Sequence, residues 1–139
     1  TSDDLIHWTV CENEESKKPI EVLHPRMGYF DSRLVEPGPY ALLDRDGIVL
    51  IYNGSNAANY NDTSIPKFTY SAGTALFDKN NPFKLLDRSK GSFIKPDKDY
   101  EKVGEVNEVC FVEGLVFFKD KWYLYYGTAD SKIAVAIRE

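Results

Sequence analysis

The chain has 139 residues, of which 17 are Lys or Arg and 22 are Asp or Glu, and its formal net charge is −5. Because phosphate contacts need a basic surface, this charge argues against general nucleic-acid binding. No apolar run approaches the roughly 20 residues that span a bilayer, so we expect no membrane partner either.

Runs of β-branched and aromatic residues between turn residues predict strands along the chain. In chain order the predicted strands are 48–52, 70–77, 108–112, 115–118, 121–126 and 132–138. The segment 81–89 fits one helical turn and a loop equally well, and no segment has the periodicity of an amphipathic helix. The sequence therefore predicts an all-β fold with irregular connections.

One pattern occurs twice, in which an aromatic-aliphatic strand ends at Tyr-x-Gly and, after a loop, a small-residue strand follows. The first copy is 47–54 with 71–75, and the second is 121–127 with 133–136. Residues 1–10 resemble the tail of an earlier unit, with a turn before Leu-Ile-His-Trp. Repeated units of short strands are typical of β-propeller blades.

A blade takes roughly 40–50 residues and the smallest propellers have about four blades, so a chain of this length cannot close the ring. We therefore expect residues 1–139 to be the C-terminal part of a single β-propeller domain, whose N-terminal blades are absent from this chain. The expected fold class is all-β, as a partial propeller. A complete small β-sandwich is the alternative.

The two cysteines, Cys11 and Cys110, lie far apart, and the sequence has no CxxC or HExxH spacing. We expect two buried or half-buried free thiols, with a bridge between them as the alternative. The sequence predicts no metal site and no cofactor.

Five stretches in order resemble motifs of one enzyme family. They are SDDLIHW at 2–8, EPGP at 36–39 with YNG at 52–54, YSAGTALFD at 70–78, GEVNEVCF at 104–111 and YYGTAD at 125–130. On these motifs the chain resembles the C-terminal portion of glycoside hydrolase family 130, the mannoside phosphorylases and β-mannosidases. The resemblance implies a five-bladed propeller with catalytic function, β-linked mannosides as substrate, and no cofactor.

The partners that the resemblance implies are an oligosaccharide and the N-terminal blades of the same protein. Those blades would supply the catalytic acid, which has no match here, so we expect this chain by itself to be inactive. A homo-oligomer stays open, as does the choice between the cytoplasm and the periplasm of a bacterium.

Two glutamates are the candidate catalytic residues. Glu36 stands where the family often has Gly, and it fits a base that activates water; a solvated loop position is its alternative. Glu108 lies inside a predicted strand, where alternation places it on one face with Val106 and Cys110. A carboxylate among apolar neighbours is costly unless it is paired or functional.

The candidate substrate-binding residues come from several loops and strand ends. Asp130 matches the aspartate with which the family binds sugar hydroxyls, although it also fits a turn residue. Arg26, Asp31 and Tyr29 lie in a loop that can reach the cleft, where Tyr29 offers a stacking face for a pyranose ring. The remaining candidates are Glu113, which can face the same channel, and Asn53.

The mode of cleavage depends on the charge of the pocket. An inverting hydrolase activates water with a second carboxylate, whereas a phosphorylase must hold a phosphate dianion with cations or other donors. The family's Lys and His positions match Leu34 and Asn53, which carry no charge, although a shift of one residue would place Arg33 at the Lys position. The sequence therefore favours hydrolysis; the alternatives are inverting phosphorolysis and a non-catalytic sugar-binding propeller.

Overall fold

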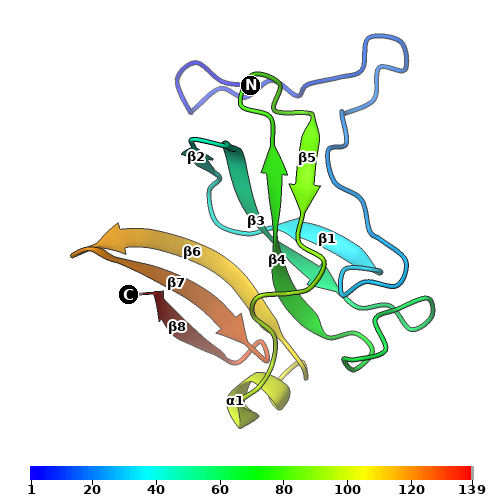
Figure 1. The fold of residues 1–139 in the computed structure, drawn as a ribbon, viewed down its shortest axis with the longest axis vertical. Coiled ribbons are helices and arrows are strands. Elements are labelled where there is room, and N and C mark those ends of the chain that lie inside the picture. Colours follow the sequence, from blue (N-terminus) through cyan, green and yellow to red (C-terminus); the bar gives the residue numbers. More distant parts are fainter. Residues whose placement is uncertain (139) are drawn as a thin grey trace.

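A computed structural model gives the fold of residues 1–138, and the chain consists of two antiparallel β-sheets with long connections (Figure 1). The first sheet has the order β1-β3-β4-β5, and β2 also pairs with β3. The second sheet has the order β6-β7-β8. The elements in chain order are β1 Leu34–Pro37, β2 Leu42–Asp44, β3 Gly47–Ser55, β4 Tyr70–Phe77, β5 Leu85–Arg88, α1 Asp99–Lys102, β6 Cys110–Phe118, β7 Lys121–Thr128 and β8 Lys132–Arg138.

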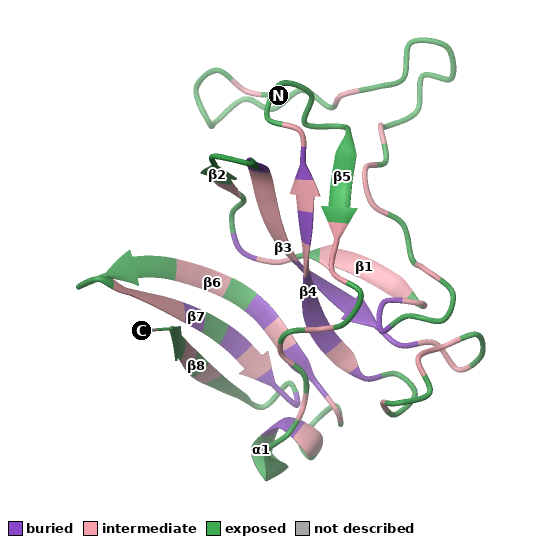
Figure 2. Cartoon of the chain, viewed as in Figure 1, coloured by how far each residue is buried: buried purple, intermediate pink, exposed green. Residues whose placement is uncertain are grey.

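Two clusters of buried side chains hold the sheets in place. One joins Ala72 of β4 to Cys110 and Val112 of β6 and to Leu124 and Tyr126 of β7. This cluster lies where the two sheets meet, and Figure 2 shows buried positions on β4, β6 and β7 at that junction. Removal of this apolar surface from water is the main term that stabilises the contact between the sheets.

The second cluster places the loop before β1 against the first sheet. Phe30 of that loop packs with Tyr52 of β3 and with Ala75 and Phe77 of β4. A Cβ atom added at Gly73 would lie 2.5 Å from the Phe30 ring, closer than real contacts allow. Glycine at this position therefore lets the loop approach the strand directly.

The expected all-β class is confirmed, and the predicted strand at 70–77 is observed with those bounds. The runs 108–112 and 115–118 form one strand, β6, which begins at Cys110 and contains a shift in register. The strands β1, β2 and β5 were not predicted, because they are only three or four residues long and too short for a clear alternation. In the segment 81–89, a single turn closed by the hydrogen bond from the Lys84 N–H to the Asn81 carbonyl is followed by β5.

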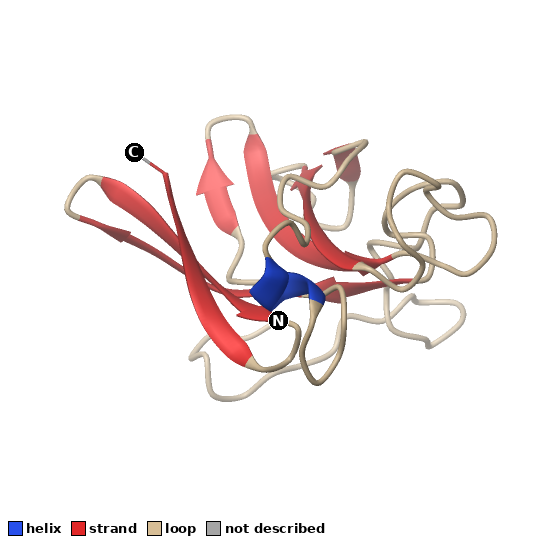
Figure 3. Cartoon of the chain, turned by 90° about the horizontal axis from the view of Figure 1, so that it is seen from below, coloured by secondary structure: helices blue, strands red, loops and turns tan. Residues whose placement is uncertain are grey.

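Viewed from below, strands carry most of the regular structure, and α1 is the one helix within residues 1–138 (Figure 3). The backbone N–H groups of Asp97 and Lys98, just before the helix, both donate to the Glu101 carboxylate at 2.8 Å. No helix in this part of the chain is long and apolar enough to cross a membrane. Within the same residues, no three His, Cys, Asp or Glu side chains are grouped so that they could hold a metal ion.

Residues 1–10, which resemble the tail of an earlier unit, contain no strand. Residues 2–8 form bends in which the Asp4 carboxylate accepts hydrogen bonds from the backbone N–H groups of Ile6 and His7. These local bonds compete with extended pairing, as short polar side chains commonly do. Cys11 is half-buried and Cys110 is buried, and both are free thiols as expected.

Candidate active site

A pocket of about 470 Å³ is lined by residues of both sheets. Its walls come from β1, the start of β4, the segment before β6, β6 itself and the turn after β7. The lining residues are Arg33, Glu36, Tyr70, Val106, Val109, Phe111, Glu113 and Asp130. Three carboxylates and one guanidinium thus face a common space, with apolar and aromatic side chains between them.

Glu36 reaches the pocket from the short strand β1. Its Cα stands opposite that of Asn53 in the antiparallel β1–β3 ladder. The side chain is half-buried, and its Oε2 atom is buried without a hydrogen-bond partner. A buried carboxylate oxygen without a hydrogen-bond partner lowers the stability of the fold. Glu36 therefore fits a residue with a chemical role better than a residue that stabilises the fold.

Glu113 reaches the pocket through a β-bulge. Val112 of β6 pairs with Tyr126 of β7, and Gly114 pairs with the preceding Tyr125, so Glu113 is the extra residue. A bulge turns one side chain out of the strict alternation of a strand. Glu113 lines the same pocket as Glu36.

Asp130 lies in the turn between β7 and β8, where it is exposed toward the pocket. Both Ala129 and Asp130 adopt left-handed backbone conformations, with φ of 46° and 50°. Aspartate tolerates this conformation better than most residues, and non-glycine residues held there cluster at functional sites.

Tyr70 and Arg33 line the pocket although sequence reasoning did not select them as site residues. Burial raises the pKa of the Tyr70 hydroxyl, the charges of Glu36 and Asp130 raise it further, and Arg33 lowers it. The Tyr70 ring lies 5.9 Å from that of Phe111, and the Arg33 guanidinium lies 5.2 Å from the ring centre of Phe68. For these two residues the sequence held one indication, the alternative alignment shifted by one residue, which places Arg33 at the family's Lys position, where it would contact an anion.

Glu108 does not line this pocket, and the predicted alternation around it is wrong. The residue precedes β6 and has a left-handed φ of 60°, so Val106, Glu108 and Cys110 do not share one strand face. Its carbonyl accepts a hydrogen bond from the Tyr70 backbone at 2.9 Å, and its N–H donates to the Lys102 carbonyl at 3.1 Å. These bonds hold a bent connection where the apolar run predicted an extended one.

Asn53 is fully buried and lies away from the pocket lining. Its side-chain amide donates to the carbonyl of Val112 at 2.9 Å and to that of Pro37 at 3.2 Å. Its Oδ1 atom accepts from the Val112 backbone N–H at 2.8 Å. A substrate contact by Asn53 therefore does not fit this geometry, because the amide is occupied by protein backbone.

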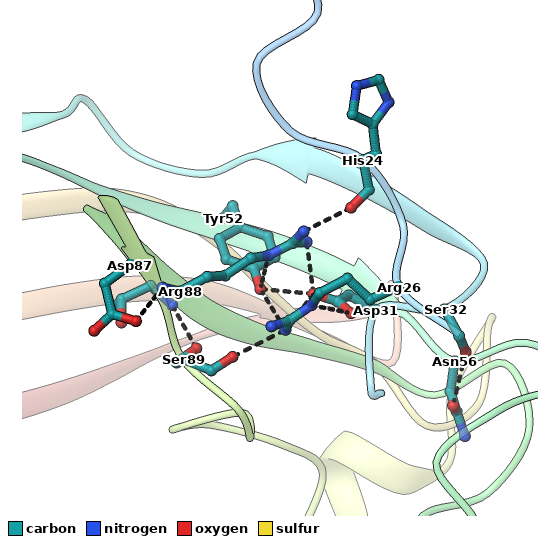
Figure 4. A network of polar contacts seen from close by, with 10 residues as sticks. His24, Arg26, Asp31, Ser32, Tyr52, Asn56, Asp87, Arg88 and Ser89 are labelled. Atoms are coloured by element: carbon teal, nitrogen blue, oxygen red, sulfur yellow. Dashed lines mark hydrogen bonds and ion pairs between the residues drawn. The ribbon is translucent and has the colours of Figure 1, made fainter. Parts of the chain in front are cut away.

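Arg26 and Asp31 belong to a separate polar cluster outside the pocket lining (Figure 4). Tyr29 also lies outside the pocket lining, next to Arg26. The buried Asp31 carboxylate accepts hydrogen bonds from Arg26, from the Tyr52 hydroxyl at 2.7 Å and from Arg88 at 2.6 Å. Burial raises the pKa of Tyr52 to about 12, and its hydrogen bond to Asp31 acts in the same direction.

The outer side of this cluster is more open. The Arg26 guanidinium lies 4.3 Å from the centre of the Tyr29 ring, and Tyr29 is partly exposed. Arg88 was missed because no strand was predicted in segment 81–89, which fitted a helical turn and a loop equally well, whereas the structure places β5 there. The cluster ties the loop before β1 to the first sheet, and that role needs no ligand.

The family model described as beta-1,4-mannooligosaccharide phosphorylase matches residues 1–139 of the chain. The chain belongs to glycoside hydrolase family 130. A curated family 130 relative, a 1,2-beta-oligomannan phosphorylase from a Thermoanaerobacter species, is 33% identical over 138 residues. The match covers 99% of this chain and 41% of that relative. Three further curated relatives, from Thermoanaerobacter, Listeria innocua and Ruminococcus albus, are also named mannoside phosphorylases.

Solved family 130 structures match the fold closely. One is a Parabacteroides distasonis protein provisionally named a glycoside hydrolase, at 50% identity and a TM-score of 0.95, covering 98% of this chain and 39% of that one. Another comes from work on family 130, and its description says that this family of mannoside phosphorylases contains glycoside hydrolases that target β-1,2 mannosidic linkages in Candida mannan. It is 45% identical with a TM-score of 0.95, covering 99% of this chain and 38% of that one. The expected match to part of a family 130 propeller is thereby confirmed.

Proposed function

We propose that the whole protein cleaves β-linked mannosides and that the pocket of this chain holds part of the sugar and one reacting carboxylate. The observation that carries the proposal is the convergence of Glu36, Glu113 and Asp130 on one pocket of a family 130 domain. Carboxylates bind sugar hydroxyls and also supply the acid and base that glycoside cleavage needs. The chain spans about two fifths of the length of its relatives, so the remaining part of the site comes from outside it.

In the proposed reaction Glu36 is the base. It removes a proton from a water molecule, whose oxygen forms a bond to the anomeric carbon as the glycosidic carbon–oxygen bond breaks. An acid from outside this chain protonates the leaving oxygen. Asp130 binds hydroxyls of the sugar, and Glu113 lines the same pocket from β6. Glu108, the other expected catalytic residue, is given no role in this scheme because it does not line the pocket.

The charge balance of the pocket favours hydrolysis. A phosphate dianion would meet one guanidinium and three carboxylates, and a like charge at 4 Å costs about 1 to 4 kcal/mol depending on the effective dielectric. Water carries no such penalty, and a carboxylate base beside the anomeric carbon is what an inverting hydrolase requires.

Phosphorolysis is the second candidate. It is favoured over hydrolysis by the curated relatives, which are named phosphorylases. The structure also supplies one cation, because Arg33 lines the pocket and Leu34 does not. This position of Arg33 fits the alternative alignment, in which a shift of one residue places Arg33 rather than Leu34 at the cation position of the family. Arg33 is the residue of this chain that would hold phosphate.

The deciding experiment uses the whole natural protein that carries this sequence, with β-1,2- and β-1,4-linked mannobiose, with and without inorganic phosphate. Equal release of free mannose in both conditions supports hydrolysis. Mannose 1-phosphate that appears only with phosphate, and is lost in Arg33→Gln but not in the exposed-site control Arg45→Gln, establishes phosphorolysis. Sugar binding without release under either condition would contradict an enzymatic function and favour a binding module.

A further inference from the structure

Two of the three segments that bring a carboxylate to the pocket, β1 with Glu36 and β6 with Glu113, meet at one buried side chain. Glu36 stands opposite Asn53 in the β1–β3 ladder, and Glu113 directly follows Val112, whose N–H and carbonyl both bond to the Asn53 amide. Asn53 also donates to the carbonyl of Pro37, the residue after Glu36. The amide therefore touches the backbone beside each of the two acids while lying outside the pocket itself.

The contact at Val112 falls where the β6–β7 ladder is irregular. The register shifts between Val112 and Gly114, and a bulge disrupts the regular hydrogen bonds of its strand. Val112 is fully buried, so its backbone groups need partners, and Asn53 supplies a donor and an acceptor in one planar group. A Cβ atom at Gly38, just after β1, would lie 3.1 Å from the Val112 side chain, so the end of β1 also packs against this point.

We infer that Asn53 is a positioning residue, which holds β1 and the bulge of β6 together so that Glu36 and Glu113 line the pocket at a set separation. The inference rests on the proposed function, because that separation matters only if both acids act on a bound sugar. Asn53 does this through backbone hydrogen bonds and never touches substrate, since it is fully buried and its polar atoms are engaged.

Asn56 offers a matched control three residues further along. It is an equally buried asparagine, near the end of β3, but its amide donates to the carbonyls of Asp62, Ile65 and Pro66 within the following loop. Truncation of either residue removes a buried amide of the same size. Only truncation of Asn53 releases the bulge that carries Glu113.

The test compares Asn53→Ala and Asn56→Ala in the whole protein on β-linked mannobiose, at a temperature where both variants remain folded. We expect Asn53→Ala to lower kcat by about tenfold to a hundredfold with KM changed less than about threefold, the cost of misplacing a reacting group by about 1 Å. Asn56→Ala should lower thermal stability as much while lowering kcat far less. If Asn53→Ala does not fold, Asn53→Ser is used, because its one hydroxyl proton can replace only one of the two hydrogen bonds that the Asn53 amide donates.

Amide hydrogen exchange of the peptide around Val112 tests the hydrogen bonds between Asn53 and the Val112 backbone, and it does not depend on an activity assay. Exchange there should rise in the Asn53 variant and remain at the natural level in the Asn56 variant. Unchanged exchange at Val112, or a raised KM with an unchanged kcat, would overturn the inference. If the natural protein cleaves no mannoside, the proposed function is wrong, and the exchange measurement still decides whether Asn53 holds the bulge.

Discussion

The carboxylate of Asp31 lies 2.6 Å from the guanidinium of Arg88, although the two residues are 57 positions apart in the sequence. The Asp31 side chain has no exposed surface and that of Arg88 is 7% exposed. Arg26 and the Tyr52 hydroxyl complete the shell around the same carboxylate. A loop that precedes the first sheet is thus fastened to β5, the last strand of that sheet.

Replacement of Asp31 by Asn should destabilise the fold strongly. The change removes the negative charge that two guanidinium groups share, and loss of one partner of a buried pair costs about 3 to 5 kcal/mol. Urea unfolding measures the difference. Asp46→Asn, which breaks the exposed pair with Arg45, is the control and should change stability by less than about 0.5 kcal/mol. Equal effects of the two substitutions on the free energy of unfolding would contradict a stabilising role of the buried cluster around Asp31.

Glu36→Gln should separate activity from stability. Loss of a general base lowers the rate by about a hundredfold to ten-thousandfold. The melting temperature should stay the same or rise, because the buried Oε2 atom has no partner to lose. Glu108→Gln is the comparison, and its smaller effect on rate follows from its place outside the pocket. A larger loss of activity in the Glu108 variant would reverse the assignment.

The stability of the protein should fall at acid pH in part through Glu101. Burial alone raises the pKa of this carboxyl, but hydrogen bonds from the backbone of Lys98 and Asp97 and from the Tyr126 hydroxyl outweigh it, so the pKa is lowered. A carboxyl whose pKa is lowered by folding stabilises the native state above its unfolded pKa of about 4.3. That contribution is lost as the pH falls through the depressed native value.

Chemical denaturation from pH 7 downward, on the natural protein and on Glu101→Gln, measures this contribution. The variant should be less stable at neutral pH, and below about pH 4 its stability should depend less steeply on pH. The difference should persist in about 1 M salt, because buried interactions are screened weakly. The pKa of the exposed Asp97 is also lowered, chiefly by its hydrogen bond with Lys98, and salt should weaken that effect. Parallel pH curves for the two proteins would rule out a role for Glu101.

The two thiols should react at very different rates in the native protein. Burial raises the pKa of Cys110 to about 12, with further contributions from the charges of Glu101 and Glu108, whereas Cys11 is half-buried. Because the thiolate is the reactive form, iodoacetamide at pH 8 should label Cys11 first and Cys110 only after unfolding. Mass spectrometry of the labelled peptides gives the order. Early labelling of Cys110 would show that the contact between the two sheets opens readily.

Local patterns were sufficient for the fold class and for much of the pocket. Alternation and β-branched residues identified the long strands β3, β4, β7 and β8, because these strands pair along most of their length. Motif order identified the family, and the sequence pattern alone pointed to Glu36, Glu113 and Asp130, which line the pocket. The sequence pattern did not predict the short strands β1, β2 and β5, because a strand of three or four residues is too short to show a clear alternation.

Only the tertiary structure decided what the remaining polar residues do. Alternation treats a strand as unbroken, so it placed Glu108 on a strand face and could not show that the chain bends there. Asn53 and Asp31 were expected at a ligand, yet each is buried against groups from distant segments, which a linear pattern does not bring together. The sequence by itself determined an all-β member of family 130. The packing of two sheets determined which acids share the pocket, because that depends on a bulge, a left-handed turn and contacts between residues far apart in the chain.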